Sequence, residues 1–245
     1  MTNGPDLGEQ ALDKIAEVAI SSQLDEAESV DVDIRADAIK VVQGKLDSVA
    51  VSGEGMTMKQ DLRIESVKVQ TSSVAIDPLK VMTGQLELTE PLNAQTRFLL
   101  TEADLNRALA SDYLRTKMQG LKIKHDGQVI SVNIEQATVH LQDNNQIQTD
   151  ASILLTETHE QKRLSSVSAL SLKDDGHQIA LEIISAEGEG LTLEFLAALF
   201  EQLLQLLNLR NFELGGSSLQ LQSLEVRSGQ MFVHATTTVK QLPKP

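Results

Sequence analysis

Apolar residues recur along this chain with two periods, one typical of helices and the other typical of strands. Between residues 8 and 24, Leu12 and Ile15 begin a stripe at the spacing of an amphipathic helix. Val30 and Val32 then alternate with acidic residues, which is the two-residue period of a half-buried strand. The same two patterns predict four later elements: a helical segment at 102–119, a β-meander at 121–185, an apolar helix at 191–209 and a hairpin at 217–240.

One ten-residue motif occurs twice. DAIKVVQGKL, at residues 37–46, returns as DPLKVMTGQL at residues 77–86. Asp37 and Asp77 are expected to cap short helices, because a short carboxylate accepts hydrogen bonds from the unpaired amides of a helix start. Each copy of the motif therefore predicts one short helix that begins directly after its aspartate.

Glycine and aliphatic residues complete each copy of the motif. Gly44 and Gly84 suit the left-handed backbone conformation that ends a short helix. Two strand–helix–strand units of a curved β-structure, within residues 29–100, are the predicted result. The repeat is interpreted as structural rather than as two copies of a binding loop. The aliphatic residues of the motif lie three apart, and we expect them to make core contacts: Ile39, Val42, Leu79 and Met82.

The segment at 102–119 is predicted to contain two helices. Thr101 and Asp104 have the spacing of a capping box at its start. The apolar stripe changes phase near Ser111, whose hydroxyl can cap a second and shorter helix. We therefore expect a break at this serine.

Alternating apolar and polar residues fill the stretch at 121–185. One alternating run ends at Ile134 and another resumes at Val139. Turn sequences interrupt the stretch at HDG, DNN, THEQ and DDG. The pattern predicts six strands here, and a closing hairpin that turns at Ser228 and Gly229.

The helix at 191–209 is the most apolar segment of the chain. Its polar residues form one narrow stripe, so its apolar arc is about twice the 100° that a helix resting on one sheet needs. A sheet should surround such a helix on most sides, or the helix should touch something apolar besides protein. The residues farthest from the polar stripe are the candidate lining of a lipid groove: Leu196, Leu199, Leu203, Leu206 and Leu207.

Composition and charge exclude several classes of function. The 245 residues include five Phe, one Tyr and no Trp, which argues against base-stacking surfaces and aromatic binding hot spots. The net charge of −14, without a basic run, argues against nucleic acid as a partner. The same charge disfavours flat binding to an anionic membrane surface.

No catalytic or metal-binding signature occurs in the sequence. The five histidines lack metal-ligand spacing, and no serine lies in a Gly-x-Ser-x-Gly elbow. We therefore expect a protein that is not an enzyme and that has no cofactor, metal site or catalytic residue. Lys80, Lys122 and Lys124 are candidates for contact with a lipid headgroup.

These pieces together resemble the LmeA-type phospholipid-binding family, whose members look like relatives of tubular lipid-binding proteins. The resemblance rests on the leucine-rich helix, the terminal hairpin, and the segments VDIRADAIKVVQGKLDSV, AIDPLKVMTGQLELTEP and LTEADLNRAL. It covers nearly the whole chain. It implies an α+β fold in which a strongly curved, mainly antiparallel sheet wraps a long apolar helix and leaves an apolar groove, with short helices elsewhere.

Two functional hypotheses remain. The first is a single lipid-binding domain over residues 1–245 that binds a phospholipid or another acyl-chain lipid, and carries it, with transient membrane contact. The second is a structural or adaptor protein whose core is filled by its own side chains. The sequence starts without an export signal and contains no span of about 20 apolar residues. A cytoplasmic protein, peripheral to a membrane at most, is the corresponding expectation.

Overall fold

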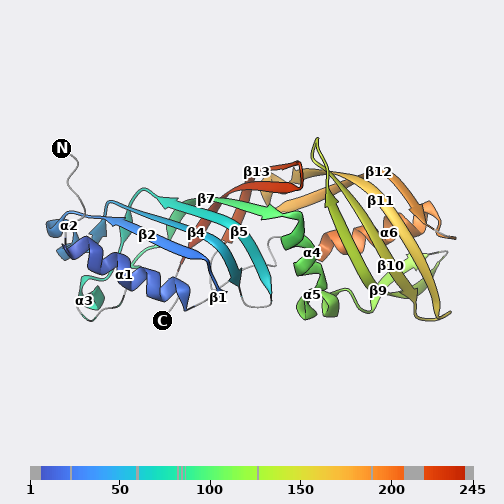
Figure 1. Ribbon diagram of the computed structural model, residues 1–245, viewed down its shortest axis with the longest axis horizontal. Coiled ribbons are helices and arrows are strands. Elements are labelled where there is room, and N and C mark those ends of the chain that lie inside the picture. Colours follow the sequence, from blue (N-terminus) through green and yellow to red (C-terminus); the bar gives the residue numbers. More distant parts are fainter. Residues whose placement is uncertain are drawn as a thin grey trace.

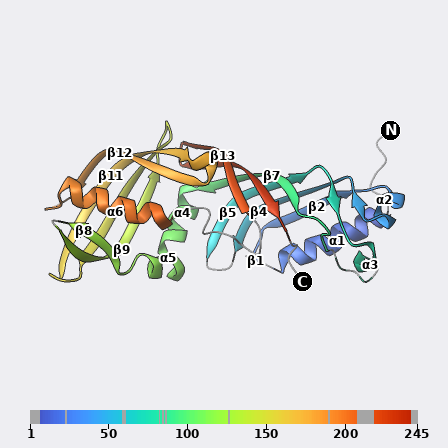
Figure 2. The same ribbon diagram turned by 180° about the vertical axis from the view of Figure 1, so that it is seen from behind.

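The computed structural model shows an elongated molecule with one antiparallel sheet in each half (Figure 1). Helix α1 lies beside the first sheet and helix α6 beside the second, as Figure 2 shows from the other side. The structure describes residues 7–22, 24–58, 61–81, 83, 85, 87–125, 127–188, 190–206 and 218–240.

The first sheet combines strands from both ends of the chain. Its strands are β1 (Leu24–Glu26), β2 (Ser29–Arg35), β4 (Ser48–Met58), β5 (Leu62–Thr71), β7 (Leu92–Thr101), β13 (Ser218–Arg227) and β14 (Gln230–Val239). Their order is β1-β4-β5-β7-β14-β13, β2 also pairs with β4, and all pairs are antiparallel. The predicted hairpin turn at Ser228 and Gly229 is confirmed, and both residues have positive φ. Strand β14 of this hairpin pairs with β7, so the hairpin completes the first sheet.

The second sheet is an antiparallel meander of five strands. Their order follows the chain: β8 (Leu121–His125), β9 (Gln128–Leu141), β10 (Gln146–Leu155), β11 (Glu160–Lys173) and β12 (Gln178–Gly188). The prediction of six strands is wrong, because the runs around Ile134 and Val139 belong to one strand. A bulge at Glu135 leaves Ile134 opposite Ile153 and Gln136 opposite Ser152. One extra residue reverses which positions face the core, so the apolar positions change from even to odd numbers.

Short helices connect and cover the two sheets. They are α1 (Leu7–Ser21), α2 (Ala38–Val42), α3 (Pro78–Val81), α4 (Glu102–Ala110), α5 (Asp112–Lys117), α6 (Leu193–Leu206) and the 3₁₀ turn η1 (Asp174–Gly176). The predicted capping box is confirmed: Asp104 donates its amide to Thr101 Oγ1 at 3.1 Å, and Thr101 donates its amide to Asp104 Oδ2 at 2.8 Å. The predicted break is confirmed too, since Ser111 Oγ accepts from the amide of Leu114 at 3.3 Å. The architecture is mostly antiparallel β-structure with a curled sheet and short helices.

Three apolar clusters form the core of the described residues. The N-terminal cluster lies between α1 and the first sheet, and includes Leu12, Val32 and Ile34. The α6 cluster lies between α6 and the second sheet. The junction cluster lies where the two sheets meet, and includes Leu170 and Val226. The interior is therefore apolar along most of the length of the molecule.

Hydrogen bonds join the two halves at the junction. Val226 donates its amide to Asn145 Oδ1 at 2.6 Å, and Asn145 donates its own amide to the carbonyl of Val226 at 3.2 Å. Asn106 of α4 binds β9 through a similar pair of hydrogen bonds. Its Oδ1 accepts from the amide of Val139, and its Nδ2 donates to the carbonyl of Val139. These paired contacts satisfy buried backbone groups that neither sheet satisfies alone.

The two copies of the repeated motif lie together at one end of the molecule. We call this end the tip: α2, α3 and the two-stranded pair of β3 (Lys45–Leu46) with β6 (Val74–Ala75) (Figure 1). The predicted caps are confirmed, since Asp37 accepts from the amide of Ile39 at 2.8 Å and Asp77 accepts from that of Leu79 at 2.9 Å. Gly44 has the predicted positive φ of 75°.

The predicted core contacts of the repeat are wrong. Ile39 is 69% exposed, Val42 is 78% exposed and Leu79 is 73% exposed. Val41 packs against the N-terminal cluster instead, so α2 turns a different side toward the core. Met82 and Gly84 lie outside the described residues.

Candidate functional site

Helix α6 places its most apolar side against the second sheet. Thr192 precedes the helix, and its Oγ1 accepts a hydrogen bond of 3.2 Å from the amide of Phe195, which fixes where the helix begins. Leu196 is 2% exposed and Leu199 is 0% exposed, whereas Glu201 lies on the solvent side. The side of α6 that carries Leu196 and Leu199 is therefore enclosed by protein, whereas the other side of the helix faces solvent.

The wall opposite α6 is built by all five strands of the second sheet. Helix α6 contacts both edge strands, β8 and β12. These strands lie at opposite edges of the curled sheet, so α6 reaches from one edge of the sheet to the other. The side chains that this wall contributes to the α6 cluster include Ile123, Val132, Ile134, Ile153, Leu164 and Ala186. They are aliphatic, so the surface facing α6 offers no fixed aromatic shape.

The candidate groove residues fall into three groups. Leu196 and Leu199 are buried in the α6 cluster, and Leu203 is half-buried against it. The side chain of Leu206 and the whole of Leu207 lie outside the described residues. The structure thus brings the first three together along one side of α6, with enclosure decreasing toward Leu203.

A family model described as LmeA-like phospholipid-binding matches residues 5–236, nearly the whole chain. The chain belongs to the LmeA-like family. The family is described by the binding of phospholipid rather than by a catalysed reaction. Comparison with curated proteins and with solved structures gives no match.

The interior of this LmeA-like chain contains hydroxyl groups that the sequence analysis missed. Ser166 is 2% exposed and Ser168 is 3% exposed, and neither Oγ has a hydrogen-bond partner among the described residues. Both lie on β11 between Leu164 of the α6 cluster and Leu170 of the junction cluster. Thr71, on β5 of the first sheet, has a third hydroxyl of this kind. A buried hydroxyl without a partner costs about 1–3 kcal/mol, so most folded proteins contain few of them.

The sequence carried a signal for the two serines. Along LSSVSALS, residues 164–171, every second residue faces inward, and Ser166 and Ser168 occupy inward positions between leucines. Small polar residues at inward positions of a strand indicate either an internal hydrogen-bond network or a polar ligand group. Alternation alone could not distinguish these two outcomes.

Paired charges of this LmeA-like chain gather where α4 meets the first sheet. The guanidinium of Arg63 donates to Asp104 Oδ1 at 2.6 Å, and Asp104 is 2% exposed. Burial favours the neutral acid, but hydrogen bonds from Thr101 and Arg63 outweigh it and hold the pKa of Asp104 below its usual range. The pKa of Arg63 is raised, first by its bond to Asp104 and then by its bond to Glu65.

The lysines considered for headgroup contact do not converge. Lys80 lies on α3 at the tip and is paired with Glu87, at 3.8 Å. Lys122 and Lys124 are exposed on β8, in the other half of the molecule. No helix of the described chain is both long enough and apolar enough to cross a membrane.

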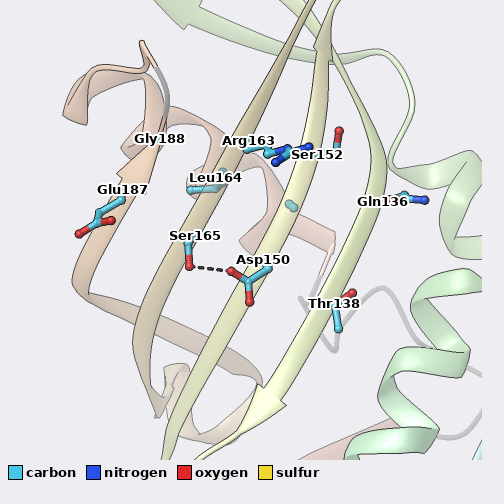
Figure 3. Close-up of a pocket in the computed structure, with 10 residues that line it drawn as sticks. Gln136, Thr138, Asp150, Ser152, Arg163, Leu164, Ser165, Glu187 and Gly188 are labelled. Atoms are coloured by element: carbon cyan, nitrogen blue, oxygen red, sulfur yellow. Dashed lines mark hydrogen bonds between the residues drawn. The ribbon is translucent and has the colours of Figure 1, made fainter.

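A polar surface hollow lies on the face of the second sheet that points away from α6 (Figure 3). Its volume is about 640 Å³, and Ser165 donates a hydrogen bond of 2.6 Å to Asp150 across its floor. Ser165 and Asp150 lie opposite each other on neighbouring strands, whereas the adjacent pair, Leu164 and Ala151, packs in the α6 cluster. The hollow is lined mainly by polar side chains, and Ala151, Leu164 and Gly188 complete its lining. The polar side chains are Gln136, Thr138, Asp150, Ser152, Arg163, Ser165 and Glu187.

Proposed function

We propose that the chain is one lipid-binding domain, that it binds a phospholipid with its acyl chains along α6, and that it carries the lipid. Membership of the LmeA-like phospholipid-binding family is the observation that carries this proposal. The curled second sheet and α6 supply the apolar surfaces, and Leu203 marks where their packing becomes less complete.

Acyl chains suit the chemistry of this interior. Each methylene group that leaves water contributes about 0.8 kcal/mol, so a single chain supplies a large gross driving force. Aliphatic walls accept flexible chains of different lengths, because they do not impose the fixed shape of an aromatic pocket. We place the acyl chains beyond Leu199, on the side of Leu203.

The unpartnered serines support a polar ligand group in the interior beside the second sheet. A phospholipid contains ester carbonyl and phosphate oxygens, which accept hydrogen bonds. Ser166 and Ser168 could each donate one hydrogen bond to such an oxygen and so remove the cost of an unpaired buried hydroxyl. The proposed site therefore combines an apolar surface for the chains with two hydroxyl donors for the polar part of the lipid.

The complete burial of Leu196 and Leu199 favours the second hypothesis, a structural or adaptor protein with a self-filled core. The two hypotheses differ at Leu203. In a lipid groove, Leu203→Trp places its ring where the acyl chains lie. In a self-filled core, the same ring overpacks and costs about 1–3 kcal/mol.

Titration with a fluorescent phosphatidylcholine, beside thermal unfolding, tests the proposal. We expect Leu203→Trp to lower the affinity at least tenfold while keeping most of the stability. Leu199→Trp, at a fully packed position, is the matched control. It should lower the thermal stability more than Leu203→Trp does. The chain has no native tryptophan, so the emission of the introduced indole also reports whether its surroundings are apolar. A parent protein that binds no phospholipid, or a Leu203→Trp variant with parental affinity, would refute the proposed site.

A further inference from the structure

The tip exposes apolar side chains at equivalent positions of the two motif copies. Ile39 and Leu79 occupy the same motif position and are 69% and 73% exposed, and Val42 is 78% exposed. Eight large hydrophobic residues are exposed in the described chain, and these three belong to the two small helices α2 and α3. Single exposed apolar residues are common, but a group on adjoining elements indicates a contact surface.

The tip is held in a fixed arrangement. The amide of Ile76 donates to the carbonyl of Gly44 at 2.9 Å, and β3 pairs with β6 beside this bond. Leu46 and Val74, which lie opposite each other in this pair, are buried in the N-terminal cluster. The inward residues thus anchor the tip, and the exposed residues are free of any role in that anchoring.

The charges of the tip are balanced locally, and the pattern is the same in both copies. Asp37 and Asp77 are occupied as helix caps. Lys40 forms an ion pair with Asp47, seven residues later, and Lys80 forms the equivalent pair with Glu87. Lys45 and Glu90 are exposed as well. The described residues of the tip therefore form no basic patch for anionic lipids, whereas paired charges are compatible with zwitterionic headgroups.

We propose that the tip docks end-on against a zwitterionic phospholipid bilayer, with Ile39, Val42 and Leu79 inserted at its interface. A fluid bilayer accepts a small convex group of aliphatic side chains, whereas a stable protein–protein interface needs about 800 Å² from each partner. The motif copies contain no aromatic residue that could act as a binding hot spot. End-on contact also keeps most of the acidic surface away from the membrane. The inference rests on the proposed function, because carriage of a phospholipid requires contact with a bilayer.

Flotation with phosphatidylcholine vesicles tests the docking. We expect the triple variant Ile39→Ser, Val42→Ser, Leu79→Ser to bind vesicles at least tenfold less than the parent, with an unchanged thermal midpoint. Leu193→Ser is the matched control, because Leu193 is 72% exposed on α6 in the other half of the molecule. Vesicle binding of this control should equal that of the parent, and higher salt should not release the parent.

A second titration separates docking from the proposed lipid site. It uses a short-chain phosphatidylcholine below its micelle concentration, which needs no bilayer. The triple variant should bind this monomeric lipid like the parent but extract lipid from vesicles at least tenfold more slowly. If the parent floats through its tip yet binds no monomeric lipid, docking stands and the proposed function fails.

Three flotation results would overturn the docking proposal. They are a parent protein that does not float, a triple variant that floats like the parent, and a Leu193→Ser variant that loses flotation to the same extent as the triple variant. Sedimentation velocity supplies a fourth: a parent dimer that the triple variant converts to a monomer, without vesicle binding by either, would assign the tip to a second copy of the chain.

Discussion

The amide of Ile76 donates a hydrogen bond of 2.9 Å to the carbonyl of Gly44, and this bond joins the first copy of the repeated motif to the residue directly before the second copy. Gly44 ends α2 with a φ of 75°, and a Cβ at this position would lie 2.5 Å from the carbonyl oxygen of Ile76. The same Cβ would lie 3.2 Å from Cδ of Pro78, so the start of the second copy limits the space at the end of the first.

Gly44→Ala is therefore expected to destabilise the protein by about 2–4 kcal/mol. The positive φ and the close carbonyl both oppose an added methyl group. Gly127→Ala is the matched control, because Gly127 has a φ of 76° and no heavy atom within 4 Å of the added Cβ. It should cost only about 1–2 kcal/mol, the strain of the left-handed conformation itself. Equal losses of unfolding free energy for the two variants in urea would show that the contact with Ile76 does not contribute to the cost at Gly44.

Asp37→Ala and Asp77→Ala should each lower the free energy of unfolding by about 1 kcal/mol. Each aspartate caps a helix start through one side-chain hydrogen bond, and this is the usual value of such a cap. Phospholipid affinity per folded molecule should stay at the parental level. Loss of binding with an unchanged thermal midpoint would give the capping aspartates a direct role in the ligand site.

Local chemistry made part of the structure predictable from sequence. The caps at Asp37 and Ser111 depend on neighbouring atoms only, so residue type and spacing were sufficient. The exposure of Val42 was not predictable. Helix α2 has only five residues, which is too short for a polar stripe that would identify the side facing the core. The bulge at Glu135 hid the continuity of β9 for a related reason, since alternation restarts in the opposite phase. Leu199 lies buried against the second sheet, and its role as a groove residue stays a prediction, because a groove residue and a core residue share the same sequence pattern.

Asp104→Asn should cost about 2–3 kcal/mol near neutral pH, because it weakens hydrogen bonds to a charged and buried group. The pKa of Asp104 is lower in the folded protein than in the unfolded chain. The carboxylate therefore contributes to the free energy of unfolding above the ordinary aspartate pKa, and this contribution is lost as pH falls through the pKa of the folded protein. Unfolding free energy should therefore depend less steeply on pH between about 5 and 2 in the variant.

Asp61→Asn is the control for this pair. Asp61 also forms an ion pair with an arginine, Arg107, but both side chains are nearly half exposed. The expected loss is at most about 0.5–1 kcal/mol. A parental pH dependence in Asp104→Asn would show that this carboxylate does not control acid unfolding.

Ser166→Ala and Ser168→Ala should leave the stability of lipid-free protein unchanged or slightly higher. Each removes a buried hydroxyl that has no partner among the described residues. Phospholipid affinity should fall several-fold, because a hydrogen-bond donor to the lipid is lost. Ser165→Ala, on the opposite face of the same strand, removes a bond to Asp150 instead and should not change affinity. Clear destabilisation by Ser166→Ala, with affinity preserved, would assign its hydroxyl to the protein's own network.

The lipid content of the protein itself tests the central claim most directly. The purified chain is incubated with phosphatidylcholine vesicles, separated from them and extracted with organic solvent, and the phospholipid per chain is quantified by mass spectrometry. We predict stoichiometric phospholipid in the parent and in Leu193→Ser, and strong depletion in Leu203→Trp. A folded parent that yields no phospholipid, or equal amounts from the parent and Leu203→Trp, would contradict a lipid site along α6.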